Sequence, residues 1–248
     1  MFGVIGGTGL DNIEGLVVEK NEVIKTPYGS PSEPLTFGML GKNRVIFLAR
    51  HGKNHSIPPH LINYQANIWA LHSVGVKNLI AINTVGSIET KFMPGDVVFP
   101  SQIIDYTYCR KHTFFDGIKN PVKHIDFTFP FDNNLRNNFL EVSKLLKLNY
   151  HMNAVYASVQ GPRLESIAEI NRYENDGANI VGMTGMPETS LAKEIGLNYA
   201  LICPVANHAS GRGLNKDGVT HEEISMNSKK MALNITSLIK GIIEKHGN

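Results

Sequence analysis

Short apolar runs rich in β-branched residues alternate along this chain with longer segments that carry apolar residues at helical spacing. The short runs predict buried strands, because they have the length of a strand and no continuous polar face. They occupy residues 2–5, 45–49, 79–82, 97–99, 155–159, 180–183 and 200–205. The longer segments predict helices over residues 61–74, 135–146, 165–173, 188–194 and 221–245. This alternation indicates an α/β fold whose largely parallel sheet has helices on both faces.

Polar and turn-forming stretches separate these elements. Thr220 and Glu223 have the spacing of a capping box, in which each side chain satisfies a free backbone donor at the start of the last helix. Residues 94–96 predict a turn, and the polar stretch 109–123 predicts a loop long enough to have a function. We find no internal repeat or linker, so we expect residues 1–248 to form a single domain.

Charge and cysteine content narrow the class of protein. Lys and Arg number 24 against 22 acidic residues, and this net charge of +2 gives no support for nucleic-acid or membrane partners. Cys109 and Cys203 fit neither a disulfide framework nor a metal-ligand spacing, which is typical of a reducing compartment. The first residues form no basic leader, and no apolar run is long enough to cross a membrane. We therefore expect a cytoplasmic protein.

The first predicted strand ends in a motif suited to anion binding. Gly6, Gly7, Thr8 and Gly9 follow this strand directly, so backbone N–H groups and the Thr8 hydroxyl can converge on an anion. A dinucleotide-binding loop would need a helix after these glycines. Only a few residues separate Gly9 from the apolar run 16–18, too few for that helix. The motif therefore favours a phosphate site over a nucleotide cofactor.

Later strand ends add further polar groups. Arg50 and His51 close one strand, where the guanidinium could make bidentate contacts with phosphate and the imidazole could donate another hydrogen bond. Two more strand ends supply Asn83, Thr84 and Thr184. Ligands of α/β sheets bind outside the carboxyl ends of the strands, so we expect one shared anion site. His51 and His55 have the spacing of a metal pair, but no zincin-type glutamate lies between them and no metal is expected.

Two motifs in the second half of the chain extend this site toward a heterocycle. Residues 182–188 form a glycine-rich turn with a hydroxyl side chain, which can hold an oxyanion. Residues 161–165 precede it and end in Glu165, whose carboxylate can bind a polar edge of a base. Together the two motifs indicate an enzyme that holds an anion beside a heterocycle.

In order, and over nearly the whole chain, these motifs resemble those of the trimeric purine nucleoside phosphorylase and methylthioadenosine phosphorylase family. The resemblance rests on residues 5–9, 50–52, 63–67, 94–96, 161–163 and 183–188. It implies a single αβα domain with a mixed, largely parallel central sheet, and a homotrimer. It also implies reversible phosphorolysis of a purine nucleoside to free base and sugar 1-phosphate, with inorganic phosphate as co-substrate and no cofactor.

The resemblance further implies a role for each matched site residue. Phosphate would be held by Thr8, Arg50, His51, Asn83, Thr84 and Thr184. Met183 would lie against the ribose and Leu164 against the purine. His124 resembles a residue that reaches into the sugar pocket of the neighbouring subunit.

The positions that would read the base favour 6-oxopurines. Methylthioadenosine phosphorylases carry two aspartates where this chain has Asn207 and Ala209. The loss of both carboxylates removes the acceptor for the amino group of adenine, whereas an asparagine amide can donate to a 6-oxo group. Glu165 can accept the ring N–H that hypoxanthine and guanine possess and adenine lacks. We therefore expect Asn207 and Glu165 to be the catalytic residues in the salvage of inosine, guanosine or S-methyl-5'-thioinosine.

The 5' substituent of the substrate stays open at this stage. His221 resembles a histidine that contacts the 5'-hydroxyl of ordinary nucleosides, yet the overall pattern is also close to bacterial methylthioinosine phosphorylases. Three further alternatives remain. A methylthioadenosine phosphorylase would prefer adenine substrates, a purine-binding protein would bind without turnover, and a nucleosidase would need no phosphate.

Overall fold

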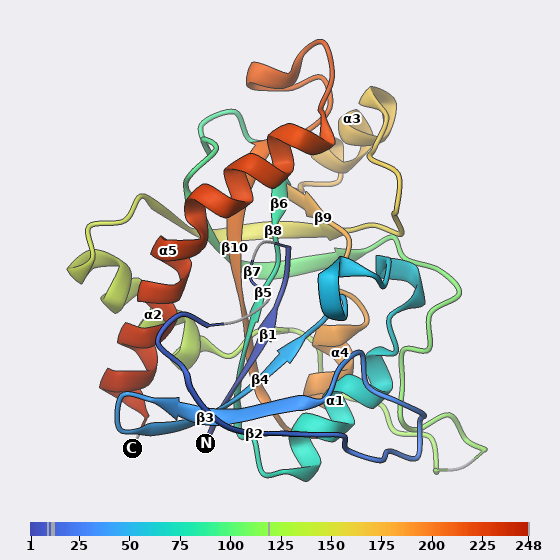
Figure 1. Cartoon of the computed structure of the whole chain (residues 1–248). Helices are drawn as coiled ribbons and strands as arrows, with labels where there is room; N and C mark the ends of the chain where they lie inside the picture. The colour runs from blue at the N-terminus through green and yellow to red at the C-terminus, as the bar shows by residue number, and fades with distance from the viewer. Residues whose placement is uncertain (9, 11–12, 119, 248) are drawn as a thin grey trace.

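One mixed sheet of ten strands runs through the part of the molecule that the structure describes (Figure 1). This computed structural model describes residues 1–8, 10, 13–118 and 120–247, apart from the side chain of His221. The strands are β1 (Phe2–Gly6), β2 (Val17–Glu22), β3 (Leu35–Leu40), β4 (Asn43–Ala49), β5 (Asn78–Ile82), β6 (Val85–Ser87), β7 (Val97–Asp105), β8 (Tyr150–Ser158), β9 (Ile180–Gly182) and β10 (Asn198–His208). Their order in the sheet is β2-β3-β4-β1-β5-β10-β6-β9-β8-β7, and β7 also pairs with β10.

The middle of this sheet is parallel. β1 pairs in parallel with β4 and β5, and β10 pairs in parallel with β5 and β6. β7 with β8 and β8 with β9 are parallel as well. Antiparallel pairs occur between β2 and β3, β3 and β4, β6 and β9, and β7 and β10. The predicted α/β class with a mixed, largely parallel sheet is confirmed.

Helices cover both faces of the sheet. They are α1 (Tyr64–Ser73), α2 (Asn133–Leu145), α3 (Ile167–Asn175), α4 (Glu188–Glu194) and α5 (His221–His246), with short 3-10 turns at Lys53–His55, Pro59–Leu61 and Gly213–Asn215. α2 packs with α5 on one face and α1 packs with α4 on the other, which gives the αβα layers (Figure 1). In the described part of the chain, no helix has the length and apolar character needed to cross a membrane.

Three strands lack the pattern that predicts a strand. β2 has the sequence Val-Val-Glu-Lys-Asn-Glu and is exposed along its whole length, because it lies at the edge of the sheet. β3 pairs antiparallel with β2, and β6 has only three residues. The edge strand β2 and the very short strand β6 bury little apolar surface, so they produce no continuous apolar run. In β3, Thr36 and Gly38 interrupt the apolar residues.

The helix starts differ in detail from the predicted capping. Thr220 accepts a hydrogen bond from the backbone N–H of Glu223 at 3.1 Å, as expected. The Glu223 carboxylate, however, accepts from Asn215 Nδ2 at 2.8 Å and so ties the first turn of α5 to the preceding loop. A reciprocal capping box forms instead at α3, between Ser166 and Glu169. At α5 the contact with Asn215 therefore takes the place of the reciprocal cap.

The carboxyl ends of the central strands bring distant parts of the chain together. β1, β4 and β5 lie side by side in parallel and lead to Thr8, Arg50 and Asn83, respectively. β10 runs parallel to β5 and ends in the segment that contains Asn207. This edge of the sheet is where α/β folds bind ligands.

Candidate active site

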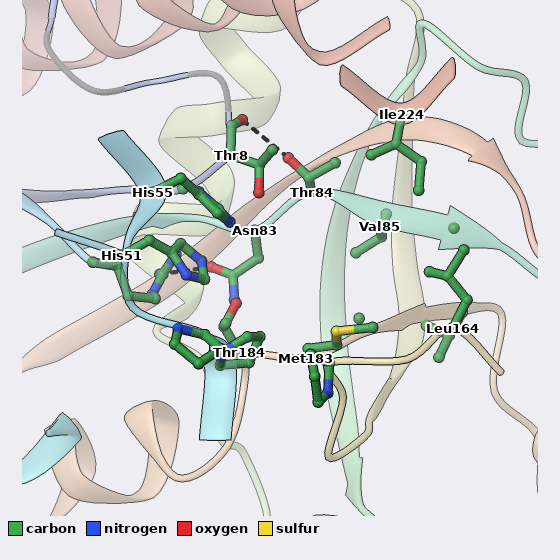
Figure 2. Close-up of a pocket in the computed structure, with 18 of the residues that line it drawn as sticks. Thr8, His51, His55, Asn83, Thr84, Val85, Leu164, Met183, Thr184 and Ile224 are labelled. Carbon is green, nitrogen blue, oxygen red and sulfur yellow. Dashed lines mark hydrogen bonds between the residues drawn. The ribbon is translucent and has the colours of Figure 1, made fainter. Parts of the chain in front are cut away.

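A cavity of about 430 Å³ opens at this edge of the sheet, within the size range of small-molecule sites. Of the residues singled out from the sequence, it is lined by Thr8, Arg50, His51, Asn83, Thr84, Leu164, Glu165, Met183, Thr184 and Asn207. In the view of Figure 2, Thr8, Thr84, Asn83 and Thr184 gather toward the histidines, and Leu164 lies on the far side with Ile224. The cavity therefore has a polar end and a more apolar end.

Arg50 is completely buried beneath the polar end. Its Nε and Nη2 atoms donate to the two carboxylate oxygens of Glu188, both at 2.7 Å. Nη2 also donates to Asn83 Oδ1 at 2.9 Å, and Nη1 donates to the carbonyl of Ile82 at 2.7 Å. Burial alone would lower the pKa of Arg50, but the Glu188 carboxylate outweighs it and raises the pKa. The bidentate fork expected to face phosphate is thus occupied by Glu188, which leaves one N–H on Nη1.

His51 lies beside Arg50 as a neutral ring. Burial, with the Arg50 charge and His55 as further causes, lowers the pKa of His51 to about 3. Its Nδ1 lies 2.9 Å from the carbonyl oxygen of Ile57, which can only accept, so Nδ1 carries the proton. Nε2 therefore has a free lone pair. In this state the ring accepts a hydrogen bond there, whereas the sequence analysis expected it to donate.

Small hydroxyl and amide groups complete the polar end. Asn83 Nδ2 donates to Thr184 Oγ1 at 2.9 Å, which leaves the Thr184 hydroxyl proton available to a ligand. Thr84 Oγ1 lies 3.3 Å from the carbonyl oxygen of Thr8 and donates to it (Figure 2). Gly9, the last residue of the predicted glycine motif, lies outside the described residues. The anion site is hence built mainly from uncharged donors.

Gly7 shows how closely the first loop packs on this site. A Cβ atom at residue 7 would lie 2.3 Å from the carbonyl oxygen of Ile82 and 3.2 Å from Nη1 of Arg50. Because the first distance is far shorter than a van der Waals contact, only glycine fits here without a shift of the backbone. The need for a small residue in the motif is thus steric.

Glu165 lies at another part of the cavity wall, before the first turn of α3. Burial raises the pKa of its carboxyl group to about 7, and the nearby Glu169 carboxylate adds to this shift. A group poised near neutral pH in a cavity is a functional-site signal, because structural carboxylates usually stay fully ionised.

Asn207 projects from β10 at an irregularity in the strand. The pairing of β10 with β6 shifts register between Val205 and Asn207, and such bulges change the direction of a side chain. Asn207 Nδ2 donates to the carbonyl of His208 at 2.7 Å and keeps a second N–H. A Cβ on Gly86 would lie 3.4 Å from this amide nitrogen, so the glycine leaves room beside it.

Two residues expected at the site, Ala209 and His124, are not among the described residues that line the cavity. Ala209 is buried in a small apolar cluster next to Gly86, so its methyl group packs against protein. His124 is exposed on the segment that follows residue 109 and does not line this cavity. The side chain of His221 lies outside what the structure describes, although α5 does begin at this residue.

The structure adds residues to which the sequence analysis assigned no role. Ile224 lies one helical turn after His221 and lines the cavity, as do Val85, Pro58 and Pro59. Spacing along α5 could have identified Ile224. The two prolines carry no such signal, because they come from a loop that only tertiary folding brings to the site. Among the described residues, no group of three or more His, Cys, Asp and Glu side chains could hold a metal ion.

Comparison with known proteins agrees with this arrangement. A family model described as the phosphorylase superfamily matches residues 1–244. A probable S-methyl-5'-thioinosine phosphorylase of Xanthomonas campestris pv. campestris is 43% identical over 236 residues, 95% of this chain and 94% of that protein. A 6-oxopurine nucleoside phosphorylase of Pyrococcus furiosus is 42% identical over 245 residues, 97% of this chain and 91% of that protein.

Solved structures show the same fold. A methylthioadenosine phosphorylase from Schistosoma mansoni in complex with adenine superposes with a TM-score of 0.94 at 28% identity, and the match covers 99% of this chain and 91% of that one. Both the family match and the structural likeness extend over almost the entire chain. The resemblance inferred from the ordered motifs is confirmed, and the chain belongs to the phosphorylase superfamily.

Proposed function

We propose that the protein is a purine nucleoside phosphorylase that cleaves 6-oxopurine nucleosides with inorganic phosphate. The products are a free purine base and a ribose 1-phosphate or methylthioribose 1-phosphate, as in purine salvage. Relatives named as S-methyl-5'-thioinosine and 6-oxopurine nucleoside phosphorylases support this function. The observation that carries it is that Glu165 and Asn207 line the same cavity as the hydroxyl groups of Thr8, Thr84 and Thr184.

The base end supports the choice of a 6-oxopurine. A Glu165 carboxylate with a pKa of about 7 can accept the ring N–H of hypoxanthine or guanine. The second N–H of Asn207 Nδ2 can donate to the 6-oxo group or to the imidazole nitrogen of the base, both of which accept. A 6-aminopurine would leave polar groups unpaired in the cavity, which is costly enough to discriminate between bases.

The phosphate end works largely through hydrogen bonds. Glu188 offsets the charge of Arg50, and His51 is neutral. The hydroxyl groups of Thr8 and Thr184 and the remaining Nη1 proton of Arg50 would donate to phosphate oxygens, and His51 Nε2 would accept the proton of a hydrogen phosphate ion. The Thr84 hydroxyl, which donates to the carbonyl of Thr8, would fix the loop beside them.

Catalysis follows from position and electrostatics. A phosphate oxygen forms a bond to C1' of the sugar while the bond from C1' to the purine nitrogen breaks. The electron pair of the broken bond leaves with the purine, and the sugar becomes cationic in the transition state. Phosphate stabilises that cation, and Asn207 stabilises the charge that develops on the base.

The 5' substituent faces the apolar end of the cavity. Ile224 lies there, with Val85 nearby (Figure 2). An apolar wall favours a methylthio group, whereas His221 at the start of the same helix favours a hydroxyl group. S-methyl-5'-thioinosine and inosine therefore both remain substrates of the proposed enzyme.

Several properties belong to the same proposal. We infer that residues 1–248 act as one domain, which the shared sheet and the large common core support. We also infer that phosphate is the only co-substrate, that no cofactor takes part, that three chains assemble, and that the enzyme works in the cytoplasm.

Base release from four nucleosides, with and without phosphate, tests the function. We expect phosphate-dependent release from inosine and S-methyl-5'-thioinosine, and much slower release from adenosine and S-methyl-5'-thioadenosine. Asn207→Asp restores one acceptor for an amino group, so it should raise the ratio of adenosine to inosine kcat/KM. Faster cleavage of the adenine nucleosides by the wild type would contradict the base assignment. Base release without phosphate would show that the enzyme is a hydrolase and not a phosphorylase. Purine binding without turnover would indicate a binding protein.

A further inference from the structure

Arg110 is a buried arginine that does not line the cavity. It belongs to the polar segment 109–123, and its residue surface is 9% exposed. Within the described chain, no carboxylate forms an ion pair with it. An unpaired buried charge is strongly destabilising unless other groups compensate it.

One side of the guanidinium group binds the two residues that follow β8, Val159 and Gln160. Nη2 donates to the carbonyl oxygen of Gln160 at 2.8 Å and to that of Val159 at 3.3 Å. Nε donates to the side-chain oxygen of Gln160 at 3.1 Å. These residues directly precede the segment 161–165, which carries Leu164 and Glu165.

The other side holds the turn between β9 and α4. Nη1 donates to the carbonyl oxygens of Met183 at 2.8 Å and Met186 at 2.6 Å. These two carbonyls flank Thr184, so the contacts fix the backbone on either side of a residue assigned to phosphate. Nη1 also donates to the Tyr64 hydroxyl at 3.2 Å.

The segment that carries Arg110 is itself anchored. Thr113 Oγ1 and the backbone N–H of Phe114 each donate to the Glu194 carboxylate at 2.7 Å. Gln65 Nε2 donates to the carbonyl of Thr113 at 2.6 Å. Arg110 is therefore held against α1 and α4 while its guanidinium reaches the two site segments.

We propose that Arg110 is a positioning residue that fixes the base-binding segment 161–165 relative to the phosphate-binding turn 183–187. The proposal rests on the proposed function. In phosphorolysis the nucleophile and the departing base must lie on opposite sides of one carbon atom, so the distance between their two binding segments matters directly. A misplacement of about 1 Å in such a site costs roughly a hundredfold in rate.

A lysine cannot take over this task. The guanidinium group is planar and presents five N–H donors in a fixed fork, which allows it to hold two backbone segments at once. An ammonium group keeps the charge but offers three donors from a single nitrogen. The Arg110→Lys variant should therefore fold, but it should no longer hold segments 161–165 and 183–187 in place and should lose most of the catalytic activity.

The test compares Arg110→Ala and Arg110→Lys with Arg136→Ala. Arg136 is a matched control, because it is 8% exposed and donates to Asn133 and Asn153, away from the cavity. For both Arg110 variants we expect kcat to fall on the order of a hundredfold. The KM values for nucleoside and for phosphate should change less, because the residues that contact each substrate are still present. Millimolar guanidinium chloride should restore activity to Arg110→Ala, and equal sodium chloride should not.

Amide hydrogen exchange of the ligand-free protein provides a readout that needs no turnover. In Arg110→Ala we expect faster exchange in residues 159–165 and 183–187 and unchanged exchange in β1 and β5. Faster exchange throughout the molecule, or activity that guanidinium does not restore, would overturn a positioning role. An inactive wild type would refute the proposed function, and the local exchange pattern would still decide the role of Arg110.

Discussion

At the scale of single residues, Arg50 and His51 present less positive charge to the cavity than a simple cationic phosphate site would. Arg50 forms its bidentate contact with Glu188 of the same chain, and His51 is held neutral by burial. A charge without access to water needs a partner, and here that partner is a protein carboxylate. For Glu165, burial outweighs the opposing effect of the Arg163 charge and raises the pKa of the carboxyl group to about 7.

The pKa of about 7 for Glu165 predicts a pH effect on substrate binding. The carboxylate accepts the purine N–H only when it is ionised, so KM for inosine should fall as pH rises through about 7. Steady-state kinetics across this range measure it, and Glu165→Gln should remove the dependence. A KM for inosine that does not change with pH would mean that Glu165 does not contact the base.

The same shift predicts how stability depends on pH. Because the folded pKa lies above the ordinary value of 4.5, the unfolded chain binds fewer protons between these two values. The contribution of Glu165 is therefore fully present below pH 4.5 and is lost as pH rises through about 7. Urea unfolding of the wild type and Glu165→Gln should show a difference that changes with pH in this direction.

At the scale of elements, the short helix α4 fastens the strand ends beneath the site. Its first residue, Glu188, binds Arg50 at the end of β4 and accepts from the Tyr199 hydroxyl of β10 at 2.8 Å. All three side chains are fully or almost fully buried. A helix of seven residues has little stability of its own, so these contacts hold it in place.

Glu188→Gln should have two separable effects. It leaves the Arg50 charge buried without a counterion, so the free energy of unfolding should fall by about 3–5 kcal/mol. The uncompensated charge should attract anions, so KM for phosphate should fall while KM for inosine changes less. Urea unfolding and steady-state kinetics measure the two effects.

Tyr199→Phe is the matched control for Glu188→Gln. It removes one hydrogen bond to the same carboxylate and keeps the ion pair, so its cost should be about 1 kcal/mol with no change in phosphate KM. Equal effects of the two substitutions would show that Glu188 acts only as packing.

Prediction of elements from the sequence succeeded where burial is continuous. The predicted helix at 188–194 has the observed bounds, and the buried central strands were found to within a few residues. β2 was missed because an edge strand is stabilised by pairing with its neighbour and needs no apolar run. β3 lies between β2 and β4, and it was missed because Thr36 and Gly38 interrupt its apolar residues. The capping box predicted for α5 does not form completely, because the Glu223 carboxylate accepts a hydrogen bond from Asn215 of the preceding loop.

At the scale of the whole molecule, an exposed apolar region indicates where chains could associate. Tyr108, Ile118, Val122 and Phe129 are each more than half exposed along one polypeptide segment, and His124 lies among them. A segment that exposes several large apolar side chains is a candidate interaction surface. Together with the inferred trimer, this arrangement favours a His124 that serves the cavity of a neighbouring chain.

Light scattering should therefore give three times the mass of one chain. If His124 serves a neighbouring cavity, His124→Ala should raise KM for inosine, and because its exposed ring contributes little to packing, the mass should stay unchanged. His72→Ala is a matched control, since His72 is an exposed histidine on α1. A fully active monomer would contradict the trimer proposal, and a KM unchanged by His124→Ala would remove His124 from the site.

Local patterns in the chain were sufficient for the alternation of strands and helices, for the family, and for most of the side chains that surround the cavity. They suffice because buried strands, strand-end glycines and polar residues after strands each produce a recognisable pattern within a few neighbouring residues. Pairings between distant residues produce no such pattern. Arg50 and Glu188 are 138 residues apart, and Arg110 and Met183 are 73 apart. Only the tertiary structure brings these groups together. Because the two arginines are buried, each needs hydrogen-bond acceptors from the protein: Glu188 binds Arg50, and backbone carbonyls such as that of Met183 bind Arg110.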